Sequence, residues 1–303
     1  MMKKYSLFYY LTRKIGCILC CIVAVLSGAN VAWSYPEQLV QHRVAADGSE
    51  SLLTPVARYT DAAGRTVDLV GAIHLADAAY YRNLNRAFLR YDKVLYEMVD
   101  GEDVPELLRL ARKIGDGTAT EEEEARFEQL IDDQQQGSDS MFNQMLSHYY
   151  VLMSQTLALS LQNDCIDYSL ENMVFADMSS EEFARAMHRR GESWFTLILR
   201  STLESGSDSL APLAFTRSGM RRTVIRALAA ESNNSSTAWE QSAIIVSRNE
   251  KCFAVFDREL ATAPRGTRIA IFYGAMHLRD MHYRLLSRGF TLQGVQWITA
   301  IRG

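Results

Sequence analysis

The sequence lacks the short motifs that mark several common enzyme classes. Its 303 residues contain no His-Glu-x-x-His pair, no Gly-x-Ser-x-Gly turn, no Walker loop and no Gly-x-Gly-x-x-Gly loop. A serine hydrolase, a nucleotide-driven enzyme and a Rossmann dehydrogenase therefore all lack their signatures.

Proline and cysteine are scarce, at five residues each, and neither sign of charge dominates, with 32 Lys and Arg against 36 Asp and Glu. Together with 48% hydrophobic residues, this composition excludes a disordered chain, a collagen-like repeat and a polytopic membrane protein. The net charge of −4 argues against a broad nucleic-acid-binding surface, so no nucleic-acid partner is expected.

The first 34 residues form a separate segment, with four basic residues and no acidic one. Residues 15–36 are uncharged and mostly apolar. This pattern predicts a secretory signal, and the small residues of Ala32-Trp33-Ser34 would make Tyr35 the first mature residue. Without cleavage, residues 15–34 would anchor the chain in a membrane. In both cases we expect export, as a periplasmic, secreted or inner-membrane-anchored protein.

Three of the five cysteines lie in that segment. Only Cys165 and Cys252 remain beyond it, and the sequence leaves open whether they form a disulfide or two separate buried thiols.

Residues 35–303 are predicted to form a single domain with an α/β unit at each end. In the first unit, residues 65–100, a strand over 66–70 forms a hairpin with 51–60 and is followed by a helix over 78–91 and a strand over 93–99. This spacing predicts a βαβ unit with parallel, adjacent strands. The second unit, residues 265–303, repeats the order strand, helix, strand.

A long helical middle, residues 101–262, is expected between these units. The fold class is therefore α/β (α+β), with duplicated βαβ-type halves and a helical insertion. The predicted helices of the insertion are a buried helix at 141–161, one starting near Ser179, and others over 193–204, 212–230 and 237–262.

Two turns that lie 203 positions apart match each other. Residues 71–80 read Gly-Ala-Ile-His-Leu-Ala-Asp-Ala-Ala-Tyr and residues 274–283 read Gly-Ala-Met-His-Leu-Arg-Asp-Met-His-Tyr, so six of ten positions are identical. The glycine allows a close backbone approach, and the aspartate is expected to cap the next helix. The histidines, His74 and His277, follow the carboxyl ends of strands, where ligand sites gather in α/β sheets.

Glu97 ends the strand after the first turn, and no acidic residue matches it in the second unit. If the two turns face each other, His74, Glu97 and His277 meet at one site. Two imidazoles and a carboxylate are a common catalytic metal set. The competing interpretation is that each histidine bonds only to backbone, but the duplication of the whole turn favours a shared site.

Arg248 shares an otherwise apolar helix face with Cys252 and Phe256. A buried arginine needs an anionic partner, which would be a carboxylate of the site or a substrate oxyanion, unless its side chain reaches solvent at the edge of the face. The adjacent Asn249 is a candidate polar support. Tyr273 precedes the second glycine and either faces the same site or is an ordinary strand aromatic.

On these residues the sequence resembles the TraB/PrgY/GumN family, which includes the Tiki proteases. That family is marked by two Gly-x-x-His motifs, a glutamate ending the strand after the first, and an Arg-Asn pair on a helix before the second. The matching residues here are Gly71, His74, Glu97, Arg248, Asn249, Gly274 and His277. The resemblance spans residues 65–300, except that residues 100–235 do not share it. It implies a fold related to the erythromycin-esterase and ChaN-like group.

The resemblance also implies metal-dependent peptide cleavage, with manganese or cobalt favoured; zinc is a further candidate. We therefore expect an exported metal-dependent hydrolase, a peptidase of the TraB/Tiki type, acting on a peptide or small signal. His74, Glu97 and His277 would hold the metal or activate its water, or Glu97 would act as general base. Arg248 would stabilise the oxyanion or, with Tyr273, bind the substrate.

Two alternatives stay open at this point. One is a non-catalytic protein that sequesters a peptide or signal in the same site. The other is a metal-free hydrolase, similar to the erythromycin esterases, in which a histidine activates water directly.

Overall fold

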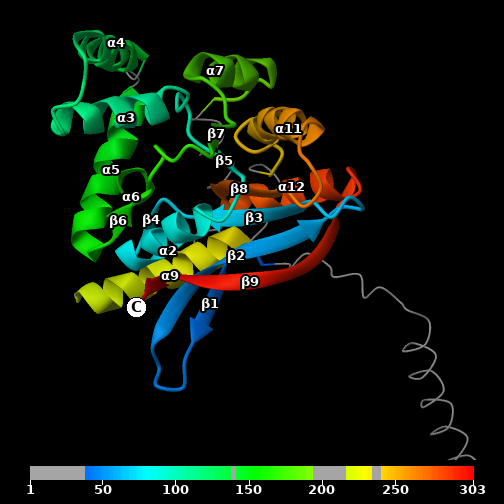
Figure 1. Cartoon of the computed structure of the whole chain (residues 1–303). Coiled ribbons are helices and arrows are strands. Elements are labelled where there is room, and N and C mark those ends of the chain that lie inside the picture. Colours follow the sequence, from blue (N-terminus) through cyan, green and yellow to red (C-terminus); the bar gives the residue numbers. More distant parts are fainter. Residues whose placement is uncertain (1–37, 138–140, 194–215, 234–239) are drawn as a thin grey trace, which may run out of the picture. The chain divides into compact units, whose positions relative to one another are not determined.

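The computed structural model describes residues 38–137, 141–193, 216–233 and 240–303 (Figure 1). The expected signal or anchor at residues 1–34 lies outside the described residues, as does nearly all of the helix expected at 193–204. None of the described helices is long and apolar enough to cross a membrane.

A seven-stranded mixed sheet forms the centre of the described fold. Strands β3, β8, β5 and β7 are parallel neighbours in that order, β2 runs antiparallel to β3, and β9 and β1 both run antiparallel to β2. The predicted hairpin is confirmed as β2 and β3. The strands are β1 (Gln41–Val44), β2 (Glu50–Thr60), β3 (Thr66–Ala72), β5 (Lys93–Tyr96), β7 (Met173–Phe175), β8 (Arg268–Gly274) and β9 (Thr291–Arg302).

The strand order differs from the expected βαβ arrangement in one respect. β3 and β5 are parallel, as predicted, but they are not adjacent, because β8 from the C-terminal unit lies between them. All residues of β8 from Ile269 to Tyr273 are buried. A strand that is apolar on both faces is stable in the interior of a parallel sheet, covered on both sides. The sequence around β3, α2 and β5 predicts two parallel strands. It cannot show that a strand from the other end of the chain lies between them.

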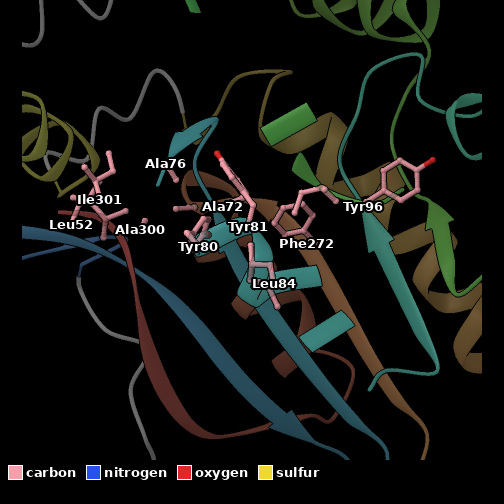
Figure 2. Close-up of a cluster of buried hydrophobic side chains, with 14 of the residues drawn as sticks. Leu52, Ala72, Ala76, Tyr80, Tyr81, Leu84, Tyr96, Phe272, Ala300 and Ile301 are labelled. Carbon is pink, nitrogen blue, oxygen red and sulfur yellow. The ribbon is translucent and has the colours of Figure 1, made fainter. Parts of the chain in front are cut away.

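Helices cover both faces of this sheet. Along β8, Ala270 and Phe272 face one buried cluster, whereas Ile269, Ile271 and Tyr273 face the other. Helices α2 (Ala78–Phe88) and α9 (Arg217–Asn233) complete the first cluster, which Figure 2 shows around Tyr81 and Phe272. Helices α11 (Val246–Ala261) and α12 (Leu278–Leu286) complete the second. The alternation along the strands therefore builds two cores, one on each face.

The middle of the chain is largely helical, as predicted, but it also adds the strand β7 to the sheet. The expected helix start at Ser179 is confirmed by a capping box between Ser179 and Glu182. The remaining elements are β4 (Leu75–Ala76), α3 (Val104–Gly115), α4 (Glu121–Gly137), α5 (Met141–Leu157), β6 (Ser160–Leu161), α6 (Gln162–Cys165), α7 (Ser180–Arg189) and a 3-10 turn, η1 (Ala275–His277).

The predicted burial of the helix at 141–161 is wrong over residues 148–156, where the described side chains are exposed or half-buried. In α5, Tyr149 and Leu152 are 54% and 62% exposed, whereas Leu157 is buried. Among the side chains that the structure describes in this helix, Met153 and Leu157 belong to or pack against the first cluster. Cys165 and Cys252 are both free thiols, so they form no disulfide in the structure.

Gly71 lies where two segments approach the end of β3. A Cβ atom there would lie 2.9 Å from Cδ of Pro55 and 3.2 Å from Cδ2 of Leu278. The glycine of the first turn thus permits a close approach, as the sequence suggested.

We therefore expect Gly71→Ala to lower the free energy of unfolding by about 1–3 kcal/mol, because overpacking displaces Pro55 or Leu278. Gly294→Ala is the matched control, since a Cβ at that position in β9 meets nothing within 4 Å. Urea denaturation of both variants measures the difference. Equal stability of the two would show that the close approach at Gly71 is unimportant.

Candidate functional site

The ends of three neighbouring parallel strands carry the candidate residues. His74 follows β3, His277 follows β8 and Glu97 follows β5, and β8 is the middle strand. Because β8 separates β3 from β5, the residue next to Glu97 is His277 rather than His74. The histidine of the second turn therefore lies closer to Glu97 than the histidine of the first turn does.

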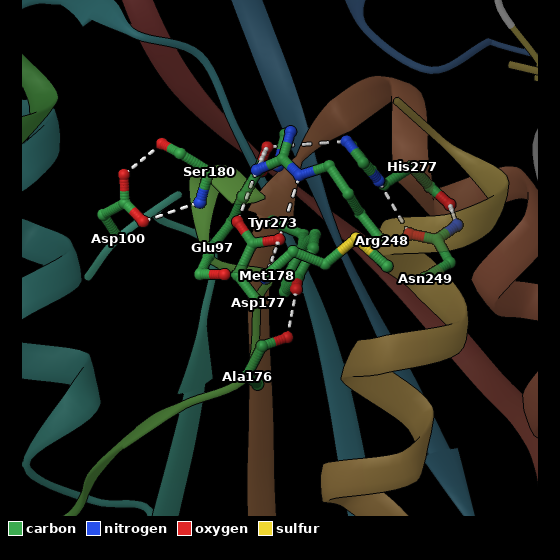
Figure 3. Close-up of polar contacts among 12 residues, drawn as sticks. Glu97, Asp100, Ala176, Asp177, Met178, Ser180, Arg248, Asn249, Tyr273 and His277 are labelled. Atoms are coloured by element: carbon green, nitrogen blue, oxygen red, sulfur yellow. Dashed lines mark hydrogen bonds and ion pairs between the residues drawn. The ribbon is translucent and has the colours of Figure 1, made fainter. Parts of the chain in front are cut away.

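Glu97 is the centre of a buried polar network (Figure 3). Its Oε2 accepts the backbone N–H of Gly274 at 2.5 Å, and its Oε1 lies 2.8 Å from Nη2 of Arg248 and 3.5 Å from Nε2 of His277. A Cβ at Gly274 would lie 3.2 Å from Oε2, so the glycine lets the carboxylate reach the end of β8.

Arg248 is buried on α11 and has the anionic partners that the sequence analysis required. Besides Glu97 it binds Asp177, with Nε donating to Oδ1 at 2.9 Å and Nη2 to Oδ2 at 2.5 Å. Asp177 is fully buried and follows β7. Sequence reasoning did not identify it, because a three-residue strand has too weak a pattern to mark the residue after it.

His277 is held at its other ring nitrogen. Its Nδ1 lies 2.6 Å from Oδ1 of Asn249, and Nδ2 of Asn249 donates to the backbone carbonyl of His277 at 3.2 Å. The residue is only 3% exposed. Asn249 is therefore the polar support expected from its position beside Arg248.

His74 differs from His277, because it is exposed. Its ring meets the ring of Tyr150 edge-on, with centroids 5.6 Å apart, and makes no hydrogen bond to a described residue. Although the residue has an exposed surface, the protein atoms crowded around its ring partly desolvate it and so lower the pKa of His74. The charge of Glu97 opposes this shift, and Arg248 and His277 add to it. His74 is thus accessible to solvent and yet favoured in its neutral form.

Tyr150 is a site neighbour that the sequence did not point to. Burial raises the pKa of its hydroxyl, and Tyr149 and Glu97 raise it further. The only sequence signal was its place in the aromatic stretch of α5, which is equally typical of a core helix.

Tyr273 lies beneath the network rather than at its surface. The side chain is fully buried, its hydroxyl donates to the carbonyl of Ala176, and its ring meets that of His277 with centroids 5.2 Å apart. Burial raises the pKa of Tyr273. This position favours a supporting role over the substrate contact suggested from the sequence.

The loops after Glu97 and Asp177 are tied together by Asp100. Its backbone has a φ of 57°, which is unusual for a residue other than glycine. The Asp100 carboxylate accepts the backbone N–H of Ser180 at 2.6 Å and also its hydroxyl (Figure 3). Glu97 and Asp177, the two carboxylates that bind Arg248, therefore precede loops that are joined by hydrogen bonds.

The two aspartates of the repeated turns do not cap helices, contrary to expectation. Asp77 occupies the N-cap position of α2 without a capping hydrogen bond, and its carboxylate instead accepts the N–H of Arg302 at 2.9 Å and the Arg221 guanidinium. Asp280 lies in the first turn of α12 and accepts from Nδ2 of Asn249 at 2.8 Å. Asp77 therefore binds donors in distant segments, whereas Asp280 binds both Asn249 on α11 and Arg284 of its own helix.

The charges of this network leave room for one more cation. Glu97 and Asp177 carry two negative charges, and Arg248 supplies one positive charge. Burial alone would raise the pKa of Glu97, but the charge of Arg248, then that of His277, and finally His74 hold this pKa well below 4.5. An ionised Glu97 opposite His277 attracts a proton or a metal ion.

The residues fit a metal in chemistry and in part in geometry. Two ligands of a tetrahedral ion, with bonds of about 2.0–2.1 Å, lie about 3.4 Å apart, and Nε2 of His277 and Oε1 of Glu97 are separated by 3.5 Å. In the described part of the chain, however, no three His, Cys, Asp or Glu side chains form a group that could hold an ion. His74 would have to turn toward the other two residues.

The network predicts a large cost for removing its arginine. Arg248→Met should lower the free energy of unfolding by about 3–5 kcal/mol at neutral pH, because it leaves buried carboxylates without a counter-charge. Arg185→Met is the control, since Arg185 pairs with Glu181 on the exposed surface of α7, and it should cost no more than about 1 kcal/mol. Chemical denaturation measures the free energy of unfolding of both variants. A similar loss of stability in Arg248→Met and Arg185→Met would show that the buried carboxylates do not depend on Arg248.

The pH dependence of stability follows from the lowered pKa of Glu97. The unfolded chain takes up a proton on this group near pH 4.5 and the folded chain only at lower pH, so the contribution of Glu97 is present above pH 4.5 and lost below it. Glu97→Gln, which cannot titrate, should therefore lose less stability than the wild type between pH 5 and pH 3, by at most about 1.4 kcal/mol per pH unit. Chemical denaturation at a series of pH values measures this difference. An equal loss of stability in the wild type and in Glu97→Gln between pH 5 and pH 3 would contradict the prediction.

Comparisons of the chain with models of known protein families, with curated proteins and with solved structures gave no match in any of the three.

Proposed function

We propose that the protein is an exported hydrolase whose reaction centre is formed by His74, Glu97 and His277. We propose further that it is a divalent-metal-dependent peptidase, similar to the TraB/Tiki type. The observation that carries the proposal is the meeting of Glu97 with the second Gly-x-x-His turn, with Oε1 and Nε2 3.5 Å apart, beside the strand that carries the first turn.

The two histidines suit this role in different ways. Nδ1 of His277 is engaged by Asn249, so only Nε2 faces Glu97. His74 is accessible and has a lowered pKa, so its neutral ring retains a lone pair at neutral pH. A neutral imidazole can bind a metal or accept a proton from water.

His74, Glu97 and His277 would hold the ion, with manganese or cobalt suggested by the resemblance and zinc by the ligand types. A bound ion would lower the pKa of a bound water and polarise a carbonyl. Arg248 compensates the charge of Glu97, and its Nη1 makes no hydrogen bond to a described residue. That nitrogen is the donor available to a substrate oxyanion.

A metal-free hydrolase is a second candidate, which the Arg248–Glu97 ion pair favours. Both oxygens of Glu97 already have donors, from Arg248 and from Gly274. A carboxylate neutralised in this way is a weaker metal ligand and a weaker base. His74 would then take the proton from the attacking water.

Export remains a proposal based on residues 1–34, which would be cleaved or would attach the protein to a membrane through residues 15–34. The relation to the erythromycin-esterase and ChaN-like fold group is likewise proposed on the motifs. It is supported by the shared order of strand, turn, helix and strand in the two units.

Metal content tests the first candidate directly. The full chain, purified without chelator and reloaded with manganese, cobalt or zinc, should contain close to one ion per chain by elemental mass spectrometry. His74→Ala and His277→Ala should lose the ion while keeping the wild-type circular dichroism spectrum. His188→Ala, which changes an exposed histidine at the end of α7, should keep it.

The other outcomes discriminate among the hypotheses. Stoichiometric metal in both site variants would overturn the shared site. No metal under any loading, with turnover in a peptide or ester library, would favour the metal-free hydrolase. No metal and no turnover would favour a protein that sequesters its ligand.

A further inference from the structure

The repeated turns have diverged at their aspartates. Asp77 binds the end of β9 and Arg221, whereas Asp280 binds a residue that contacts an imidazole of the candidate site. The same residue type at the same position of the turn therefore serves the fold in one copy and the site in the other.

The contacts of Asn249 fix the orientation of its amide. Nδ2 lies 2.8 Å from Oδ2 of Asp280 and 3.2 Å from the carbonyl oxygen of His277. The carbonyl can only accept, and Asp280, which also receives Nε of Arg284 at 2.5 Å, is held as an accepting carboxylate. The amino group must therefore point at these two oxygens, and Oδ1 must face the ring of His277.

This orientation determines where the imidazole carries its proton. Oδ1 of Asn249 is 2.6 Å from Nδ1 of His277 and can only accept, so Nδ1 must donate. In neutral His277 the lone pair is then on Nε2, directed at Glu97. The partner of one ring nitrogen sets the state of the other.

We propose that Asp280 is a positioning residue that, through Asn249, holds His277 in the Nδ1–H tautomer and so keeps Nε2 available toward Glu97. Asp280 touches neither the ring nor any reacting atom. Its consequence for catalysis rests on the proposed function, but the tautomer itself does not.

The test measures the ¹⁵N chemical shifts of the His277 ring nitrogens by NMR. The sample is the full chain with ¹⁵N-labelled histidine, treated with chelator, at a pH where the ring is neutral. The His277→Gln variant identifies the signal. Asp280→Ala removes the acceptor that orients Asn249, Asp280→Asn retains an amide oxygen that can replace it, and Asp77→Ala is the matched control in the first turn.

We expect a protonated Nδ1 in the wild type and in Asp77→Ala. In Asp280→Ala the Nδ1 signal should move toward that of an unprotonated nitrogen, because the Asn249 amide can turn over. Asp280→Asn should restore the wild-type signal in large part, which a loss of folding would not do.

Three results would overturn the proposal. They are an Nε2–H tautomer in the wild type, an unchanged Nδ1 signal in Asp280→Ala, and an equal change in Asp77→Ala. All three can be read whether or not the protein hydrolyses a substrate, so failure of the proposed function is distinguishable from failure of this inference.

Discussion

The guanidinium of Arg248, buried between Glu97 and Asp177, is the interaction on which the site depends. It links α11 to the ends of β5 and β7, and Glu97 in turn reaches the end of β8 through Gly274. A buried ion pair is a doubtful source of net stability, because desolvation offsets much of the attraction. Here the ion pair fixes the geometry of the site. The carboxylate of Glu97 can contact Arg248, Gly274 and His277 together in only one orientation.

The two matching turns have different surroundings in the structure. β3 and β8 are direct neighbours in register, so the turns that follow them emerge side by side. His277 is buried and held by Asn249, whereas the exposed His74 packs edge-on against Tyr150. The two turns therefore present one imidazole fixed by a hydrogen bond and one on an exposed residue.

The parts of the fold that the sequence predicted are those set by neighbouring residues. The β2–β3 hairpin, the helix α2 and the helix start at Ser179 all follow from local spacing and turn chemistry. The separation of β3 from β5, the partnership of Asp177 with Arg248 and the place of Tyr150 beside His74 depend on contacts between distant segments. The need of Arg248 for an anion was predictable, but its partner was not, because nothing near Asp177 in the sequence marks a sheet strand.

The insertion of β8 between β3 and β5 has a consequence for the order of events during synthesis. A chain made from its N-terminus presents His74 194 residues and Glu97 171 residues before Arg268, the first residue of the strand β8 that lies between β3 and β5. Contacts of such long range form slowly, because closing a long loop costs chain entropy before the contact stabilises it. The centre therefore cannot assemble on an incomplete chain, because β8 and the His277 that follows it come near the end of the sequence.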